Sequence, residues 1–110
     1  MSERMPKVNE LIRQELGKII NEEMEFPAGV LVTITEVKTS SDLKYAKVLV
    51  SVMPLVEADQ AIRRLNNYGR HLQQALNDKV TFRFVPKLSF VFDDSEERAA
   101  DIDQLLDNLK

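Results

Sequence analysis

The sequence predicts an α+β fold in which helices pack on a three-stranded mixed sheet, and three observations lead to this prediction. Two strand patterns, residues 30–38 and 45–53, are joined by turn-forming residues and are expected to form an antiparallel hairpin. A long helical pattern follows, and then a third strand pattern. Because such a helical crossover usually joins parallel strands, the third strand should complete a mixed sheet. At 110 residues the chain is expected to be one domain, 1–110.

A helix opens the chain and leads to the hairpin. Pro6 suits the first turn of a helix, and apolar residues recur at helical spacing through about Asn21. The two strands that follow are rich in β-branched residues. Each should direct its alternate residues to the core, namely Val30, Val32 and Ile34 in the first and Ala46, Val48, Val50 and Val52 in the second.

The long helical pattern runs from about Glu57 to Asn77. At roughly 100° per residue its apolar positions fall on one side without a change of phase across Gly69. A glycine inside a helix costs about 1 kcal/mol relative to alanine, so we expect two short helices that meet at a kink. Tyr68 lies on the apolar side and is expected in the core. The apolar set is Ala58, Ala61, Ile62, Leu65, Tyr68, Leu72, Ala75 and Leu76.

The third strand pattern, residues 80–94, should form the wall of the core. Its even positions are apolar and alternate with polar ones, which is typical of a strand buried on one face. Four of the five phenylalanines lie on that face, where core packing is favoured over base stacking: Phe82, Phe84, Phe90 and Phe92. Pro86 lacks an N–H, so the segment is either one bent strand or two short collinear ones.

A final helix after Asp94 is expected to expose a strongly acidic surface. From Asp93 onward the chain carries seven of its 18 acidic residues and two of its 15 basic ones. The net charge of −3 therefore conceals a slight basic excess in residues 1–92, with 11 acidic and 13 basic residues. A phosphate-binding face remains possible there, because the local field matters more than the net charge.

The side of the helix pair opposite the core carries a basic and amide-rich stripe centred on the kink. It consists of Arg63, Asn67, Arg70 and Gln74, with Arg64 and His71 beside them. A solvated helix face explains any one of these arginines, whereas their grouping at a glycine kink favours contacts with RNA phosphates. Gly69 would let an RNA strand approach closely, and the amides of Asn66 and Asn67 could reach its backbone or base edges. His71 is expected to be a helix-surface residue.

Several classes of function lack support in the composition. With no cysteine and one histidine, neither a transition-metal site nor a cofactor is expected, and a reducing cytoplasmic setting is permitted. No apolar run has membrane-spanning length, and the charged start of the chain does not resemble a signal peptide. No nucleophile with a base and no paired carboxylates stand out, so the chain is not expected to be an enzyme.

Several blocks in this order and spacing resemble the ribosome-binding factor A family. That family carries VTIT, a valine, S-x-DL, A and V-x-VS, which match Val32 to Thr35, Val37, Ser40, Asp42, Leu43, Ala46, Val48, Val50 and Ser51. Its P-x-L-x-F-x-x-D-x-S pattern matches Pro86, Leu88, Phe90, Asp93 and Ser95. Its opening R-x-x-R-V resembles Arg4 and Lys7-Val8, and its closing I-x-x-LL resembles Ile102, Leu105 and Leu106.

The resemblance implies a KH-like domain of type II topology, in the order helix, strand, strand, kinked helix pair and strand, to which the C-terminal helix is added. It also implies a monomeric, cytoplasmic and non-enzymatic factor that binds the small ribosomal subunit and assists maturation of its rRNA. The family bends its helix pair at A-x-G, for which residues 67–69 and 68–70 are the candidates here. The expected RNA-binding residues are Arg63, Arg64, Asn67, Gly69 and Arg70 at the kink, with Arg4 and Lys7 from the opening motif. The alternative is a KH-like protein-interaction module that uses the acidic last helix and does not bind RNA.

Overall fold

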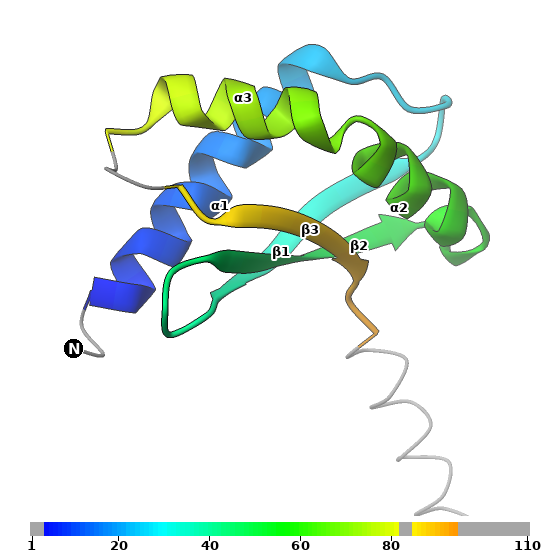
Figure 1. The fold of residues 1–110 in the computed structure, drawn as a ribbon. Coiled ribbons are helices and arrows are strands. Elements are labelled where there is room, and N and C mark those ends of the chain that lie inside the picture. Colours follow the sequence, from blue (N-terminus) through cyan, green and yellow to red (C-terminus); the bar gives the residue numbers. More distant parts are fainter. Residues whose placement is uncertain (1–3, 82–84, 95–110) are drawn as a thin grey trace, which may run out of the picture.

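The computed structural model describes residues 4–81 and 85–94, with the backbone alone for residues 4–6 (Figure 1). The final helix expected after Asp94 and two of the phenylalanines expected in the core, Phe82 and Phe84, lie outside the described residues. The elements are α1 (Arg4–Glu23), β1 (Leu31–Thr39), β2 (Tyr45–Met53), a 3₁₀ turn (Leu55–Glu57), α2 (Ala58–Asn67), α3 (Gly69–Lys79) and β3 (Lys87–Phe92).

The strands form one mixed sheet, as predicted, and their order in it is β1-β2-β3. The central strand β2 pairs antiparallel with β1 and parallel with β3. All three helices pack on one face of this sheet and contribute to a single hydrophobic cluster (Figure 1). On β2 the core side is the predicted one, because Ala46, Val48, Val50 and Val52 are all buried. The opposite face of the strand carries exposed residues such as Tyr45 and Lys47.

A bulge in β1 changes which residues face the core. The register passes from Ile34 opposite Val50 to Glu36 opposite Leu49, so Thr35 is an extra residue. After this point the core side is taken by Val37, which is 3% exposed. The bulge also sets a polar contact across the sheet, since the Thr35 hydroxyl donates to a carboxylate oxygen of Asp93 at 2.6 Å. Two motif blocks that are far apart in the sequence therefore meet in space.

The turn between β1 and β2 is built by the S-x-DL motif. The Ser40 hydroxyl donates to the Asp42 carboxylate at 2.6 Å, and the same carboxylate accepts the backbone N–H of Lys44 at 3.0 Å. These two hydrogen bonds, the side-chain one first, lower the pKa of Asp42. Leu43 has a φ of +63°, which a tight turn demands and an L-residue seldom adopts. The motif is thus explained by the geometry of the turn.

The hydrogen-bonded strand β3 begins directly after Pro86. The choice between one bent strand and two short ones stays a prediction, because residues 82–84 lie outside the described residues. The N–H of Lys87 donates to the carbonyl of Lys44 at 2.9 Å and starts the pairing with β2. Within β3 the alternation holds, since Phe90 is 2% exposed whereas Lys87 and Ser89 are exposed. Val80 is buried, but it lies at the end of α3 and outside the strand.

The helix pair breaks where the glycine predicted a kink. Helix α2 ends at Asn67 and α3 begins at Gly69, with Tyr68 between them. The expected core position of Tyr68 is wrong, because its side chain is 37% exposed and its ring lies 4.5 Å from that of His71, measured between centroids. The reason is local. At the break the backbone leaves helical geometry, with φ −90° and ψ 6°, and the side chain no longer follows the apolar side of either helix.

Candidate nucleic-acid interface

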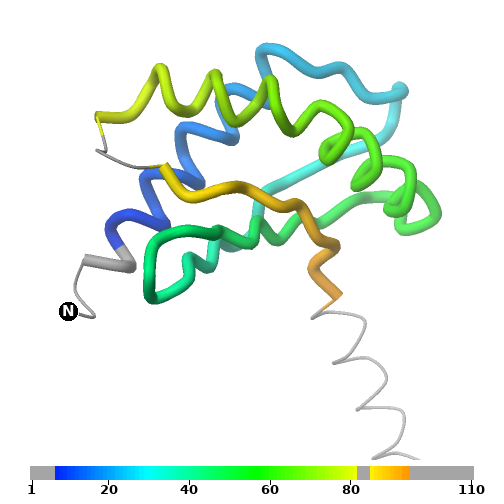
Figure 2. The backbone as a smooth tube through the Cα atoms, in the orientation of Figure 1, coloured from blue at the N-terminus to red at the C-terminus, as the bar shows by residue number. Residues whose placement is uncertain are grey.

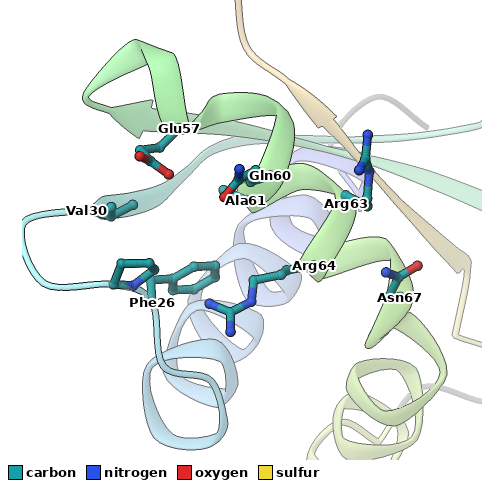
Figure 3. Close-up of a pocket in the computed structure, with 9 residues that line it drawn as sticks. Phe26, Val30, Glu57, Gln60, Ala61, Arg63, Arg64 and Asn67 are labelled. Atoms are coloured by element: carbon teal, nitrogen blue, oxygen red, sulfur yellow. The ribbon is translucent and has the colours of Figure 1, made fainter.

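The expected RNA-binding residues of the helix pair are divided between two hollows. The first hollow lies between α2 and the segment 26–30 that leads into β1, and it has a volume of about 380 Å³ (Figure 3). It contains three of the expected residues, Arg63, Arg64 and Asn67. Its lining is Phe26, Pro27, Val30, Glu57, Gln60, Ala61, Arg63, Arg64 and Asn67.

The two neighbouring arginines in this hollow differ in their contacts. Arg64 is held in place, because its Nη1 donates to the carbonyl of Glu25 at 3.1 Å and its guanidinium carbon lies 5.9 Å from the centroid of the Phe26 ring. Arg63 is exposed and has no hydrogen bond or ion pair with the described residues. The charge of Arg63 is therefore available to a ligand. The Arg64 side chain, in contrast, holds the chain that precedes β1 against α2.

The second hollow lies between the helix pair and β3 and has a volume of about 690 Å³. It contains the other two expected residues of the kink, Gly69 and Arg70. A Cβ atom added at Gly69 would meet nothing within 4 Å, so the packing of the protein does not require glycine there. Its full lining is Asn66, Gly69, Arg70, Gln73, Gln74, Asn77, Val85, Lys87 and Leu88.

Two amide side chains in the second hollow are bound to the free edge of β3. The Asn66 amide donates to the carbonyl of Phe90 at 2.9 Å and accepts its N–H at 3.0 Å. The Gln73 amide donates to the carbonyl of Pro86 at 3.0 Å and accepts the N–H of Leu88 at 2.9 Å. Both amides satisfy strand groups that would otherwise lack a partner. Asn66 thus contacts the protein's own backbone, which differs from the expectation that both asparagines are available to RNA.

Sequence reasoning also missed the contact of Gln73 with β3. A helix-surface amide carries no mark of its partner in the sequence, because the partner is a backbone group of a distant strand. The surface position expected for His71 agrees better with the structure. Its side chain is 52% exposed, and its Nε2 lies 2.5 Å from a carboxylate oxygen of Glu23 at the end of α1.

The structure does not bring Arg4 and Lys7 to the kink. They lie in the first turns of α1, and that end of the helix is at the opposite side of the molecule from the junction of α2 and α3 (Figure 2). The Lys7 side chain is exposed, and of Arg4 only the backbone is described. These two residues can act only as a separate contact for a large ligand.

The fold and the surface together define a class of protein. It is a small α+β domain in which three helices cover one face of a mixed sheet, and the helix pair bends at a glycine between two hollows that carry arginines. None of the described helices is long and apolar enough to cross a membrane. The chain belongs to the ribosome-binding factor A family, whose model matches residues 4–106. The family indicated by the sequence motifs is therefore confirmed.

Individual relatives agree with this assignment. Ribosome-binding factor A of Akkermansia muciniphila is 40% identical over 109 residues, which cover 99% of this chain and 86% of that protein. The crystal structure of ribosome-binding factor A from Thermus thermophilus superposes with a TM-score of 0.71 at 25% identity, over 79% of this chain and 93% of that chain. A homology model of the Thermus thermophilus factor, fitted into the cryo-EM map of its complex with the 30S subunit, gives a TM-score of 0.68 at 28% identity. That match covers 78% of this chain and 91% of the other.

Proposed function

We propose that this chain binds the small ribosomal subunit and assists the maturation of its rRNA as a cytoplasmic, monomeric and non-enzymatic factor. Membership of the ribosome-binding factor A family and the relative fitted into a complex with the 30S subunit support this proposal. The single hydrophobic cluster of the described residues supports a single domain. The observation that carries the proposal is the kinked helix pair, where arginines and an open glycine face solvent.

The charges at the kink suit the backbone of RNA. Arg63 and Arg70 lie on either side of the break at Tyr68, where Arg63 lines the first hollow and Arg70 the second, and both side chains are exposed. Among the described residues, neither guanidinium has an acidic partner. An arginine that is not neutralised within the protein can bind phosphate with two hydrogen bonds, and it releases counterions from the RNA when it does so.

Gly69 gives a second reason to place RNA at the kink. Glycine at the start of α3 lowers helix stability relative to alanine, yet no neighbouring atom would obstruct a Cβ there. The first N–H groups of α3 also lack a side-chain cap. An RNA strand that passes over Gly69 can therefore approach these donors closely, and the positive end of the helix dipole favours its phosphates.

Co-sedimentation with purified small ribosomal subunits across a salt series tests the proposal. We expect the wild type to bind and salt to weaken binding, whereas Arg63→Glu/Arg70→Glu fails to bind although circular dichroism shows that it is folded. Lys38→Glu/Lys47→Glu is the matched control, because it makes the same change of charge on the uncovered face of the sheet. This control should bind almost as well as the wild type.

Each other outcome rejects a defined part of the proposal. If the wild type does not bind the subunit, the proposed function is wrong. If both double variants bind equally well, or lose binding equally, the helix pair is not the RNA site and Arg4 with Lys7 becomes the next candidate. Binding that resists salt would indicate the protein-interaction module instead.

A further inference from the structure

The first hollow has the chemistry of a site for a flat, partly polar group. One wall is apolar and is formed by Phe26, Pro27 and Val30, of which Phe26 and Val30 pack against the core. The Phe26 ring faces into the space beside the Arg64 guanidinium (Figure 3). At 5.9 Å from the ring centroid, this guanidinium lies at the outer limit of a cation–π contact. Two planar groups therefore border the hollow without being tightly stacked on one another.

The wall opposite is polar and its side chains are available. Glu57 and Gln60 lie on the other side of the hollow from Phe26, and Arg63 extends from α2 at its rim (Figure 3). None of these three side chains is hydrogen-bonded to another described residue. A carboxylate and an amide, taken together, accept and donate hydrogen bonds, which is what the edge of a nucleobase requires.

The arrangement distinguishes a base from the other parts of RNA. A phosphate inside the hollow would leave the Phe26 ring and the apolar wall without a contact, and an aliphatic group would leave the polar wall unpaired. A base can place one face against the Phe26 ring and its polar edge toward α2. Arg63, at the rim, is then positioned for the adjoining phosphate. A volume of about 380 Å³ is ample for one base. The base must be unpaired, because a paired base does not expose its faces and its edge together.

We propose that this hollow is a subsite for one unpaired nucleobase of the bound RNA, with Phe26 as its stacking residue. The proposal rests on the proposed function and deepens it, because it assigns the first hollow to single-stranded RNA. It also predicts that the chain prefers unpaired RNA to a duplex.

Tryptophan fluorescence provides a direct test, because the chain contains no tryptophan. Phe26→Trp places a single indole in the hollow, and Tyr45→Trp places one on the uncovered face of the sheet as a control. The probe is a short single-stranded oligoribonucleotide, with a duplex of the same sequence for comparison. We expect the single strand to quench the indole of Phe26→Trp saturably and the duplex to do so weakly, while the fluorescence of Tyr45→Trp remains unchanged. If the single strand binds the Phe26→Trp protein without quenching, or the two indoles respond alike, the proposal is wrong.

Affinity gives an independent readout. Phe26→Leu keeps an apolar side chain against the core but removes the ring, and we expect it to weaken single-strand binding about fivefold or more, whereas Phe26→Tyr restores binding. If Phe26→Leu binds like the wild type while Arg63→Glu/Arg70→Glu does not, the proposed function stands and the base subsite is rejected. If the wild type fails to co-sediment with small subunits, the proposed function itself has failed.

Discussion

The two hollows beside the kinked helix pair contain similar residues but use them differently. In the hollow next to β3, the amides of Asn66 and Gln73 are bound to the strand backbone. In the hollow next to the segment 26–30, the amides of Asn67 and Gln60 have no partner among the described residues. Asn66 and Asn67 are adjacent, and a rotation of about 100° along the helix separates a structural role from an available one. Residue type alone therefore does not indicate which amide is available to a ligand.

The largest effect on stability is expected from removing the amide that is bound to β3. Asn66→Ala leaves the N–H and the carbonyl of Phe90 without their partner, so we expect the free energy of unfolding to fall by about 1 to 2 kcal/mol. Asn67→Ala should change it by less than about 0.5 kcal/mol, because that amide has no partner to lose. Urea denaturation followed by circular dichroism measures both.

The neighbouring glutamines form a second matched pair. Gln73→Ala removes two hydrogen bonds to the start of β3, while Gln74→Ala removes none within the described residues. Equal losses of stability within either pair would show that the amide contacts with β3 do not hold the strand.

An intermediate effect is expected at the kink between the hollows. Gly69→Ala should keep or raise the free energy of unfolding, by at most about 1 kcal/mol, because φ is not positive and a Cβ meets no atom. The same change should reduce binding to small subunits if RNA passes close to α3. Parallel denaturation and co-sedimentation experiments separate the two effects. A variant that is more stable and binds as well as the wild type would count against close approach at this position.

The smallest effect is expected in the turn at residues 40–45. This turn is joined to the lining of the second hollow by the hydrogen bond from the N–H of Lys87 to the carbonyl of Lys44. The pKa of Asp42 is lowered by hydrogen bonds from the Ser40 hydroxyl and the Lys44 N–H. The turn is therefore stabilised above the ordinary aspartate pKa of about 3.9, and this stabilisation is lost as pH falls through the lowered pKa. An NMR titration should show the Lys44 amide responding below about pH 4, and Asp42→Asn should abolish that response. A Lys44 amide that changes only with global unfolding would contradict this account.

Much of the fold could be predicted because periodicity reflects burial. The bounds of β2 are those of the predicted strand. Its antiparallel pairing with β1 agrees with the hairpin turn between them, and its parallel pairing with β3 agrees with the helical crossover. The kink was predicted because a glycine inside a helix has a known cost. The bulge at Thr35 was missed, although the spacing of three between Ile34 and Val37 is the trace that it leaves in the sequence.

The candidate site was less predictable because it depends on tertiary approach. The helical wheel placed Arg63, Asn67 and Arg70 on one surface, but it could not show that the β3 edge would bind Asn66 and leave Asn67 exposed. Nor could it indicate Phe26, which enters the first hollow from the segment that precedes β1. Tyr68 was misplaced for a related reason, because a wheel assumes continuous helical geometry and the chain departs from it at that residue.

The amides at β3 also bear on how copies of the chain behave at high concentration. A strand at the margin of a sheet can recruit a strand from another molecule, and ordered aggregates grow by this route. Asn66 and Gln73 occupy the places where such a strand would bond, and the bulge at Thr35 interrupts the opposite margin. The polar contacts that shape the second hollow therefore also discourage polymerisation, and they do so as soon as the helix pair docks on the sheet.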